Sequence, residues 1–148
     1  IAAEQFEQLK TLVAEGRWVI AELPGNKKYR LLYGNDSLIA DNQDTIKHLM
    51  RLESIAHTDQ PRGLRLAAAN REAWLDIDEE TLYQHQTDLE VRLSEARRTL
   101  SSLQARLDNP TYVEKAPAHL VEETRQQLAE QEKLIQRFIG ELEVISSR

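Results

Sequence analysis

Residues 82–107 read LYQHQTDLEVRLSEARRTLSSLQARL, and their apolar residues recur at alternating spacings of three and four. This spacing places them on one side of a helix, at the a and d positions of heptads, where only Gln86 interrupts the apolar seam. Residues 79–108 contain neither Gly nor Pro, and Asp76 or Asp78 can cap the start of the helix. The stretch therefore predicts a long coiled-coil helix with a seam of Leu82, Gln86, Leu89, Leu93, Ala96, Leu100, Leu103 and Leu107.

The residues Asp108-Asn109-Pro110 end this helix, because Pro lacks the amide hydrogen that a helix interior needs. A tip loop over 109–117 follows, and Pro117 suits the first turn of a second helix. Two helices of about 30 residues, each about 45 Å long, predict an antiparallel coiled-coil hairpin over 79–148. Two helices of a larger bundle are the alternative. The second seam is expected to consist of Val121, Thr124, Leu128, Gln131, Ile135, Phe138, Leu142 and Ile145.

The first 78 residues predict a small mixed unit of helices and strands, so that the whole chain is assigned to the α+β class. The expected elements are a helix over 3–22, a strand over 28–33, a helix over 37–54 and short strands with a hairpin within 54–78. The segment Trp18–Leu23 could instead begin a strand, since it is aromatic and β-branched. The domain boundary is expected between residues 78 and 79.

The composition is typical of a folded chain, with 41 % hydrophobic and 30 % charged residues among 148. The first residue is Ile and not Met, so the chain is expected to be a piece of a longer polypeptide. The absence of cysteine excludes disulfides, thiolate metal sites and a cysteine nucleophile. No apolar run approaches the roughly 20 residues of a membrane span, and no signal peptide is visible, so no membrane partner is expected.

The formal net charge of −6 excludes a wholly basic nucleic-acid clamp but not a local basic stripe. The excess of acidic residues is spread evenly along the chain, and no long segment is basic. Because each seam of the expected hairpin covers the other, a monomer is expected. Pairing of the two arms between chains is the alternative.

No catalytic constellation is visible in the sequence. The four histidines are scattered, the five glycines form no phosphate-binding loop, and no serine lies in a nucleophile elbow. Paired carboxylates lie at expected helix starts, where capping explains them. The sequence therefore predicts no catalytic, cofactor-binding or metal-binding residue in this chain.

Basic side chains that lie off the two seams are candidate contacts to nucleic-acid phosphates. The densest pair is Arg97-Arg98. An ordinary solvated surface with salt bridges is the alternative, and it is favoured if acidic residues interleave with the basic ones. At the tip, Tyr112 and Lys115 are further candidates, although Tyr112 could instead close the end of the hairpin core. The off-seam candidates are Arg92, Arg97, Arg98, Arg106, Arg125, Lys133 and Arg137.

Two stretches resemble the C-terminal region of bacterial valyl-tRNA synthetases. Residues 49–55, LMRLESI, are similar to the segment that closes a helix before a strand in that family. Residues 107–117, LDNPTYVEKAP, are similar to the tip of the family's coiled coil. The residues Val121-Glu122 and Leu128-Ala129-Glu130 also fit the family's second arm helix. The resemblance extends from about Phe6 to Ile145.

This resemblance implies that the chain is a tRNA-binding arm that positions tRNA for aminoacylation and editing in a cytoplasmic class I synthetase. Its partners would be tRNA and the rest of the parent chain, and the helix over 3–22 would leave the anticodon-binding region. The family's catalytic signatures are absent, so ATP, magnesium and valine would be bound elsewhere in the parent enzyme. The competing interpretation is a structural or protein-interaction hairpin.

Overall fold

The computed structural model describes residues 2–25 and 27–147, which form two compact units. The N-terminal unit extends to His85, and the arm unit comprises Gln86–Ser146. The described chain is mostly helical, with one small mixed sheet and long helices in its C-terminal half. This confirms the α+β class and the expected order of a mixed unit followed by long helices.

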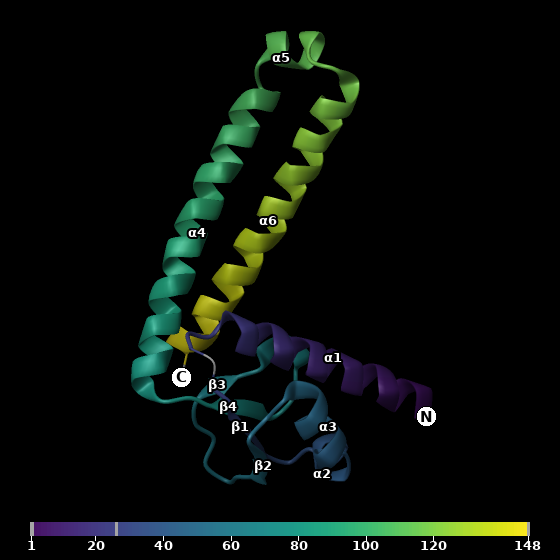
Figure 1. Ribbon diagram of the computed structural model, residues 1–148, viewed down its shortest axis with the longest axis vertical. Helices are drawn as coiled ribbons and strands as arrows, with labels where there is room; N and C mark the ends of the chain where they lie inside the picture. Colours follow the sequence, from purple (N-terminus) through teal and green to yellow (C-terminus); the bar gives the residue numbers. More distant parts are fainter. Residues whose placement is uncertain (1, 26, 148) are drawn as a thin grey trace. The chain divides into compact units, whose positions relative to one another are not determined.

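A four-stranded mixed sheet forms the centre of the N-terminal unit (Figure 1). In the sheet order β2-β1-β4-β3, β1 pairs with β2 in parallel and with β4 antiparallel, and β3 pairs antiparallel with β4. The parallel pair needs a crossover connection, which two short helices provide. The strands are β1 Arg30–Tyr33, β2 Ser54–His57, β3 Leu64–Arg65 and β4 Ala73–Asp76.

The first helix, α1, comprises Ala2–Glu22, which confirms the helix over 3–22 and excludes a strand that begins at Trp18. Leu12, Val13 and Val19 are buried. Helix α1 contacts α3, residues Gln43–Met50, and the 3₁₀ turn Ala67–Ala69. Its apolar side is therefore part of the core of the N-terminal unit.

The prediction of one helix over 37–54 is wrong. The segment forms two helices, α2, Ser37–Asp41, and α3, and the second of them ends at Met50. The Asn42 side chain donates to the Leu38 carbonyl 2.7 Å away, so that it competes with the helical backbone at the break. Arg51 is left-handed, with φ 55°, and the amide of Leu52 donates to the Lys47 carbonyl at 2.9 Å. This is a Schellman motif, which stops α3 before the strand β2.

The strand hairpin is confirmed in its core, where Leu64 pairs with Leu75 and Arg65 with Trp74. Strand β3 has only two residues, and the chain then forms the 3₁₀ turn Ala67–Ala69 rather than a longer strand. Strand β2 lies outside this hairpin, at the far edge of the sheet. In the sequence, Leu64, Leu66 and Ala68 alternate with other residues, which predicts a strand longer than the observed Leu64–Arg65.

An exposed ion pair lies at the end of β4. The Nε and Nη2 groups of Arg62 donate to the Asp76 carboxylate at 2.9 Å. The hydrogen bond from Arg62 holds the pKa of Asp76 below its ordinary value of 3.8. A carboxylate with a lowered pKa stabilises the folded state above its ordinary pKa, and this stability is lost as the pH falls through the lowered value.

We therefore expect Asp76→Asn to reduce the loss of stability of the N-terminal unit on acidification below about pH 3.8. The measurement is urea unfolding at a series of pH values, which gives the slope of the unfolding free energy against pH. Asp41→Asn is the matched control, because it removes the same charge from an exposed side chain. An acid slope that Asp76→Asn leaves unchanged would contradict this role of Arg62.

The arm unit contains the long helix α4, Glu79–Leu107, from Gln86 onward and the long helix α6, Ala118–Ser146, with α5, Pro110–Lys115, between them (Figure 1). Helix α4 begins within the N-terminal unit, where Asp78 caps it by accepting from the Thr81 amide at 3.1 Å. Every residue of both predicted seams is buried or half-buried. This burial confirms which side of each helix faces protein.

The prediction of a loop over 109–117 is wrong in one respect, because this segment contains the six-residue helix α5. Asn109 caps this helix by accepting from the Thr111 amide at 3.0 Å, and Pro110 occupies its first turn. Both residues favour a helix start more than an open loop. Pro110 was therefore correctly identified as the end of one helix, but it also begins the next.

Candidate nucleic-acid interface

The last three turns of α4, residues 96–107, carry basic residues and no acidic residue, with Glu95 and Asp108 bordering the stretch. Between Ala96 and Leu107 there are three arginines, Arg97, Arg98 and Arg106, and no acidic residue. All three arginines are exposed. Because α4 is helical throughout, spacings of three and four place Ser94, Arg97, Arg98 and Ser101 on one side.

Arg97 and Arg98 line a shallow hollow of about 660 Å³ together with Glu90, Leu93, Ser94, Ser101 and Ser102. Within the described parts of the chain, neither arginine makes an ion pair shorter than 4.0 Å. Serine hydroxyls and guanidinium groups are common donors to phosphate oxygens. This surface, which we call the α4 basic face, can therefore bind an anionic chain by several contacts at once.

The basic candidates on α6 are arranged differently, because acidic residues interleave with them. Arg125 pairs with Glu122 at 3.9 Å, and the half-buried Arg137 pairs with Glu141 at 3.4 Å. Lys133 is exposed and follows Glu132 in sequence. The basic candidates of α4 and those of α6 therefore differ in their acidic surroundings. Arg92 precedes the acid-free stretch of α4.

Tyr112 at the tip is held by packing and hydrogen bonds. Its hydroxyl lies 2.9 Å from the Thr124 hydroxyl, and its ring lies 5.8 Å from the Arg106 guanidinium carbon. The Thr124 hydroxyl also donates to the Leu120 carbonyl at 2.9 Å. These contacts join α5 to the first turns of α6 and favour the role of Tyr112 in closing the tip.

Lys115 is exposed at the end of α5.

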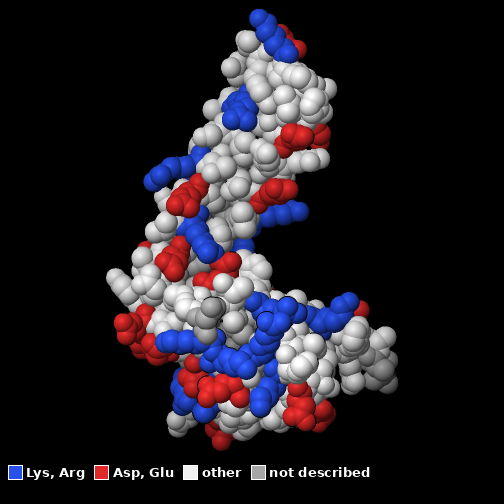
Figure 2. Space-filling model, viewed as in Figure 1, with Lys and Arg blue, Asp and Glu red and all other residues white. Residues whose placement is uncertain are grey.

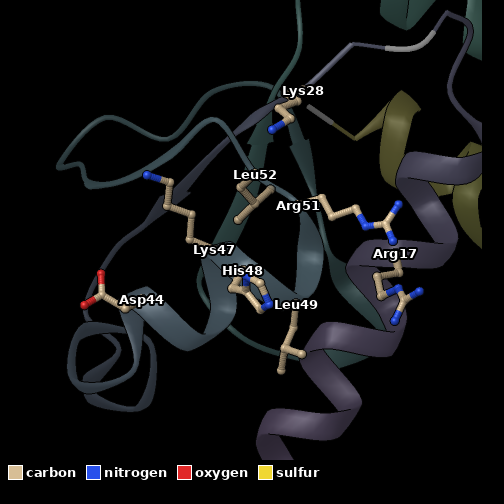
Figure 3. Close-up of a pocket in the computed structure, with 8 residues that line it drawn as sticks. All are labelled: Arg17, Lys28, Asp44, Lys47, His48, Leu49, Arg51 and Leu52. Carbon is tan, nitrogen blue, oxygen red and sulfur yellow. The ribbon is translucent and has the colours of Figure 1, made fainter.

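Charge is distributed unevenly over the molecule, and Figure 2 shows Lys and Arg gathered over the N-terminal unit on the face in view. A hollow of about 520 Å³ in this unit is lined by Arg17, Lys28, Lys47 and Arg51, with His48 and Asp44 (Figure 3). Sequence reasoning missed these basic residues because segment 1–78 has more acidic than basic residues overall. The spacing of Lys47 and Arg51, four apart at one helix end, was the one local signal for them.

Among the described residues, no group of three or more His, Asp or Glu side chains is placed so that it could hold a metal ion.

None of the helices in residues 2–25 and 27–147 combines the length and the apolar character that a membrane crossing needs.

A family model described as the valyl tRNA synthetase tRNA binding arm matches residues 76–145. The valine–tRNA ligase of Petrotoga mobilis is 29 % identical over 160 aligned positions, which cover 98 % of this chain and 18 % of that enzyme. The valine–tRNA ligase of Ruegeria pomeroyi is 35 % identical over 95 positions, which cover 62 % of this chain and 9 % of the enzyme. That of Nostoc sp. is 43 % identical over 60 positions, 40 % of this chain and 6 % of the enzyme. The chain thus spans less than a fifth of the length of these relatives.

Proposed function

We propose that this chain, whose residues 76–145 belong to the family of valyl-tRNA synthetase tRNA-binding arms, is the C-terminal tRNA-binding region of such a synthetase. The arm holds tRNA and performs no chemistry itself. The observation that carries the location of the contact is the α4 basic face, where Arg97 and Arg98 are exposed and without acidic partners among the described residues. The family match supports the identity of the ligand.

In this proposal the arm is an antiparallel two-helix coiled coil. The buried residues of the arm unit support the pairing. They include Leu103 on α4 and Val121, Ile135 and Phe138 on α6. In a unit of two long helices and one short one, the seam of each long helix is covered by the other. Such a hairpin keeps its surface arginines at fixed spacing along a straight element.

The α4 basic face contacts the phosphate backbone of tRNA and not its base edges. Double-helical RNA has a deep, narrow major groove, so that proteins recognise it mostly through shape, phosphates and 2′-hydroxyls. Each phosphate neutralised by an arginine releases counterions, which makes the affinity depend on salt. Phosphate contacts position the RNA without selecting a sequence. The arm therefore adds affinity and orientation, and the selection of valine is left to the rest of the synthetase.

The remaining parts of the proposal concern the parent protein. The rest of the synthetase chain is the second partner of this region, and it binds ATP, magnesium and valine. Each parent chain uses its own hairpin, so that the arm acts as a monomer. The place of action is the cytoplasm, where tRNA is aminoacylated.

The test is a titration of the full 148-residue chain with tRNA at about 50 mM and about 200 mM salt. We expect Arg97→Glu/Arg98→Glu to weaken binding about tenfold at the lower salt and to reduce the slope of log affinity against log salt by about two. The reason is the loss of two phosphate contacts on one face. Circular dichroism of each variant checks that the helices are retained.

The matched control is Arg125→Glu/Lys133→Glu, which makes the same change in net charge on the exposed surface of α6. We expect an effect of about twofold from this control, because acidic residues already interleave with these two positions. Equal losses in both variants would contradict the assignment of the α4 basic face. An absence of tRNA binding at the lower salt would favour the structural or protein-interaction hairpin, for which the mixed charge of α6 is suited.

A further inference from the structure

The hollow of the N-terminal unit is lined by basic side chains from three separate segments of the chain. Arg17 comes from α1, Lys28 precedes β1, Lys47 lies on α3, and Arg51 follows α3. All four side chains are exposed, and Asp44 is the carboxylate among the lining residues. In the described residues, none of the four makes an ion pair shorter than 4.0 Å. Positive charge is thus gathered in one place on a chain of net charge −6.

Part of this arrangement has a local explanation in the end of α3. Lys47 and His48 lie in the last turn of the helix, where basic residues interact favourably with the helix dipole. This explanation does not extend to Arg17 and Lys28, which come from other elements. In Figure 3 the side chains of Arg17 and Arg51 lie on one side of the hollow and those of Lys47 and Asp44 on the other, with Lys28 and His48 between them.

The backbone at Arg51 is a second observation on the same hollow. Arg51 adopts the left-handed conformation, with φ 55° and ψ 49°, which is disfavoured for residues that carry a Cβ atom and is most often taken by glycine at a helix end. The Schellman motif at this point thus places the guanidinium group of Arg51 at the rim of the hollow, where most such motifs have a glycine without a side chain. Non-glycine residues in this conformation are frequent at functional sites.

We propose that this hollow is a second RNA-binding site, in which Arg17, Lys28, Lys47 and Arg51 bind backbone phosphates of the same tRNA that the arm holds. The inference rests on the proposed function for the identity of the RNA. The hollow, about 520 Å³, has more room than one phosphate fills, and its four exposed cations come from different elements, which favours a polyanion over a single small ion. Leu49, which is 42 % exposed at its rim, offers an apolar surface to a ribose or an unstacked base.

The experiment is a titration of the full chain with tRNA at about 50 mM and about 200 mM salt, with Arg17→Glu/Lys47→Glu as the test variant. Both residues lie on helices and are exposed, so that the variant is expected to stay folded, with a slightly lower melting temperature because Glu replaces Lys47 in the last turn of α3. We expect a loss of affinity of about fivefold and a salt slope that is smaller by about two. The matched control is Lys10→Glu/Arg65→Glu, which makes the same charge change in the same unit outside the hollow, and its effect is expected to be less than about twofold.

The outcomes separate this inference from the proposed function. Equal affinities of the test variant and its control would overturn the inference, even if Arg97→Glu/Arg98→Glu still lost binding and the function of the arm stood. Loss of binding in the hollow variant without any loss in the Arg97/Arg98 variant would support the hollow and contradict the α4 basic face. Inorganic phosphate that raises the melting temperature of the unmodified chain but not of the hollow variant, with tRNA affinity the same in both, would assign the hollow to a free anion and overturn the RNA site.

Discussion

Replacing Gly63 by alanine is expected to lower the unfolding free energy of the N-terminal unit by about 3–5 kcal/mol. Gly63 has φ +84°, a conformation that residues with a Cβ atom rarely adopt. A Cβ atom at this position would overlap the carbonyl oxygen of Leu75, which is backbone of β4 and cannot rotate away. The chain before β3 would have to move away from β4, where Leu64 pairs with Leu75. Chemical unfolding monitored by the fluorescence of Trp18 and Trp74, which both lie in this unit, measures the change.

Gly25→Ala is the matched control for the cost of the backbone conformation alone. Gly25 has nearly the same φ, +83°, but no atom lies within 4 Å of its would-be Cβ position. We expect a loss of about 1 kcal/mol in this variant, which leaves the unit folded. If the two alanine variants were equally destabilised, the overlap with Leu75 would not be the cause, and the close approach of Gly63 to β4 would be contradicted.

Replacing Phe138 by alanine is expected to lower the unfolding free energy of the arm unit by about 3–4 kcal/mol. Phe138 is 6 % exposed at a d position of α6 and is the largest side chain of that seam. An arm of this size has a single narrow core, and its helices depend on packing of their apolar sides. Hydrogen exchange of the backbone amides, read along residues 86–146, measures the loss.

The same measurement tests the pairing of α4 with α6. In a paired hairpin, Phe138→Ala increases exchange in α4 as well as in α6, because the two helices share one core. Increased exchange confined to α6 would contradict the hairpin. Leu134→Ala is the control, since Leu134 lies one turn away and is 38 % exposed, and we expect it to cost less than about 1 kcal/mol.

The seam of the arm could be read from the sequence because its signal is local. Heptad spacing specifies which residues share one side of a helix, and all sixteen predicted seam residues, from Leu82 to Ile145, are buried or half-buried. The sequence signals for the two ends of α4 were also local. Asp78 caps its start, and Asp108-Asn109-Pro110 follows its last residue, Leu107. The sequence predicts one helix over 37–54 with Asp41 or Asn42 as the cap of its longer half, and the break does lie at Asn42, whose side chain donates to the Leu38 carbonyl.

The candidate sites show the same division between local and tertiary information. The arginine pair of α4 and the absence of acidic residues from Ala96 to Leu107 could be read from the sequence alone, since both are properties of consecutive residues in one helix. Only the tertiary structure brought Arg17, Lys28, Lys47 and Arg51 around one hollow, because strand pairing and helix packing place segments together that are up to 34 residues apart in the chain. Helical and strand periods describe the faces of single elements. The neighbours of those faces are decided by packing of the whole unit, which no local spacing records.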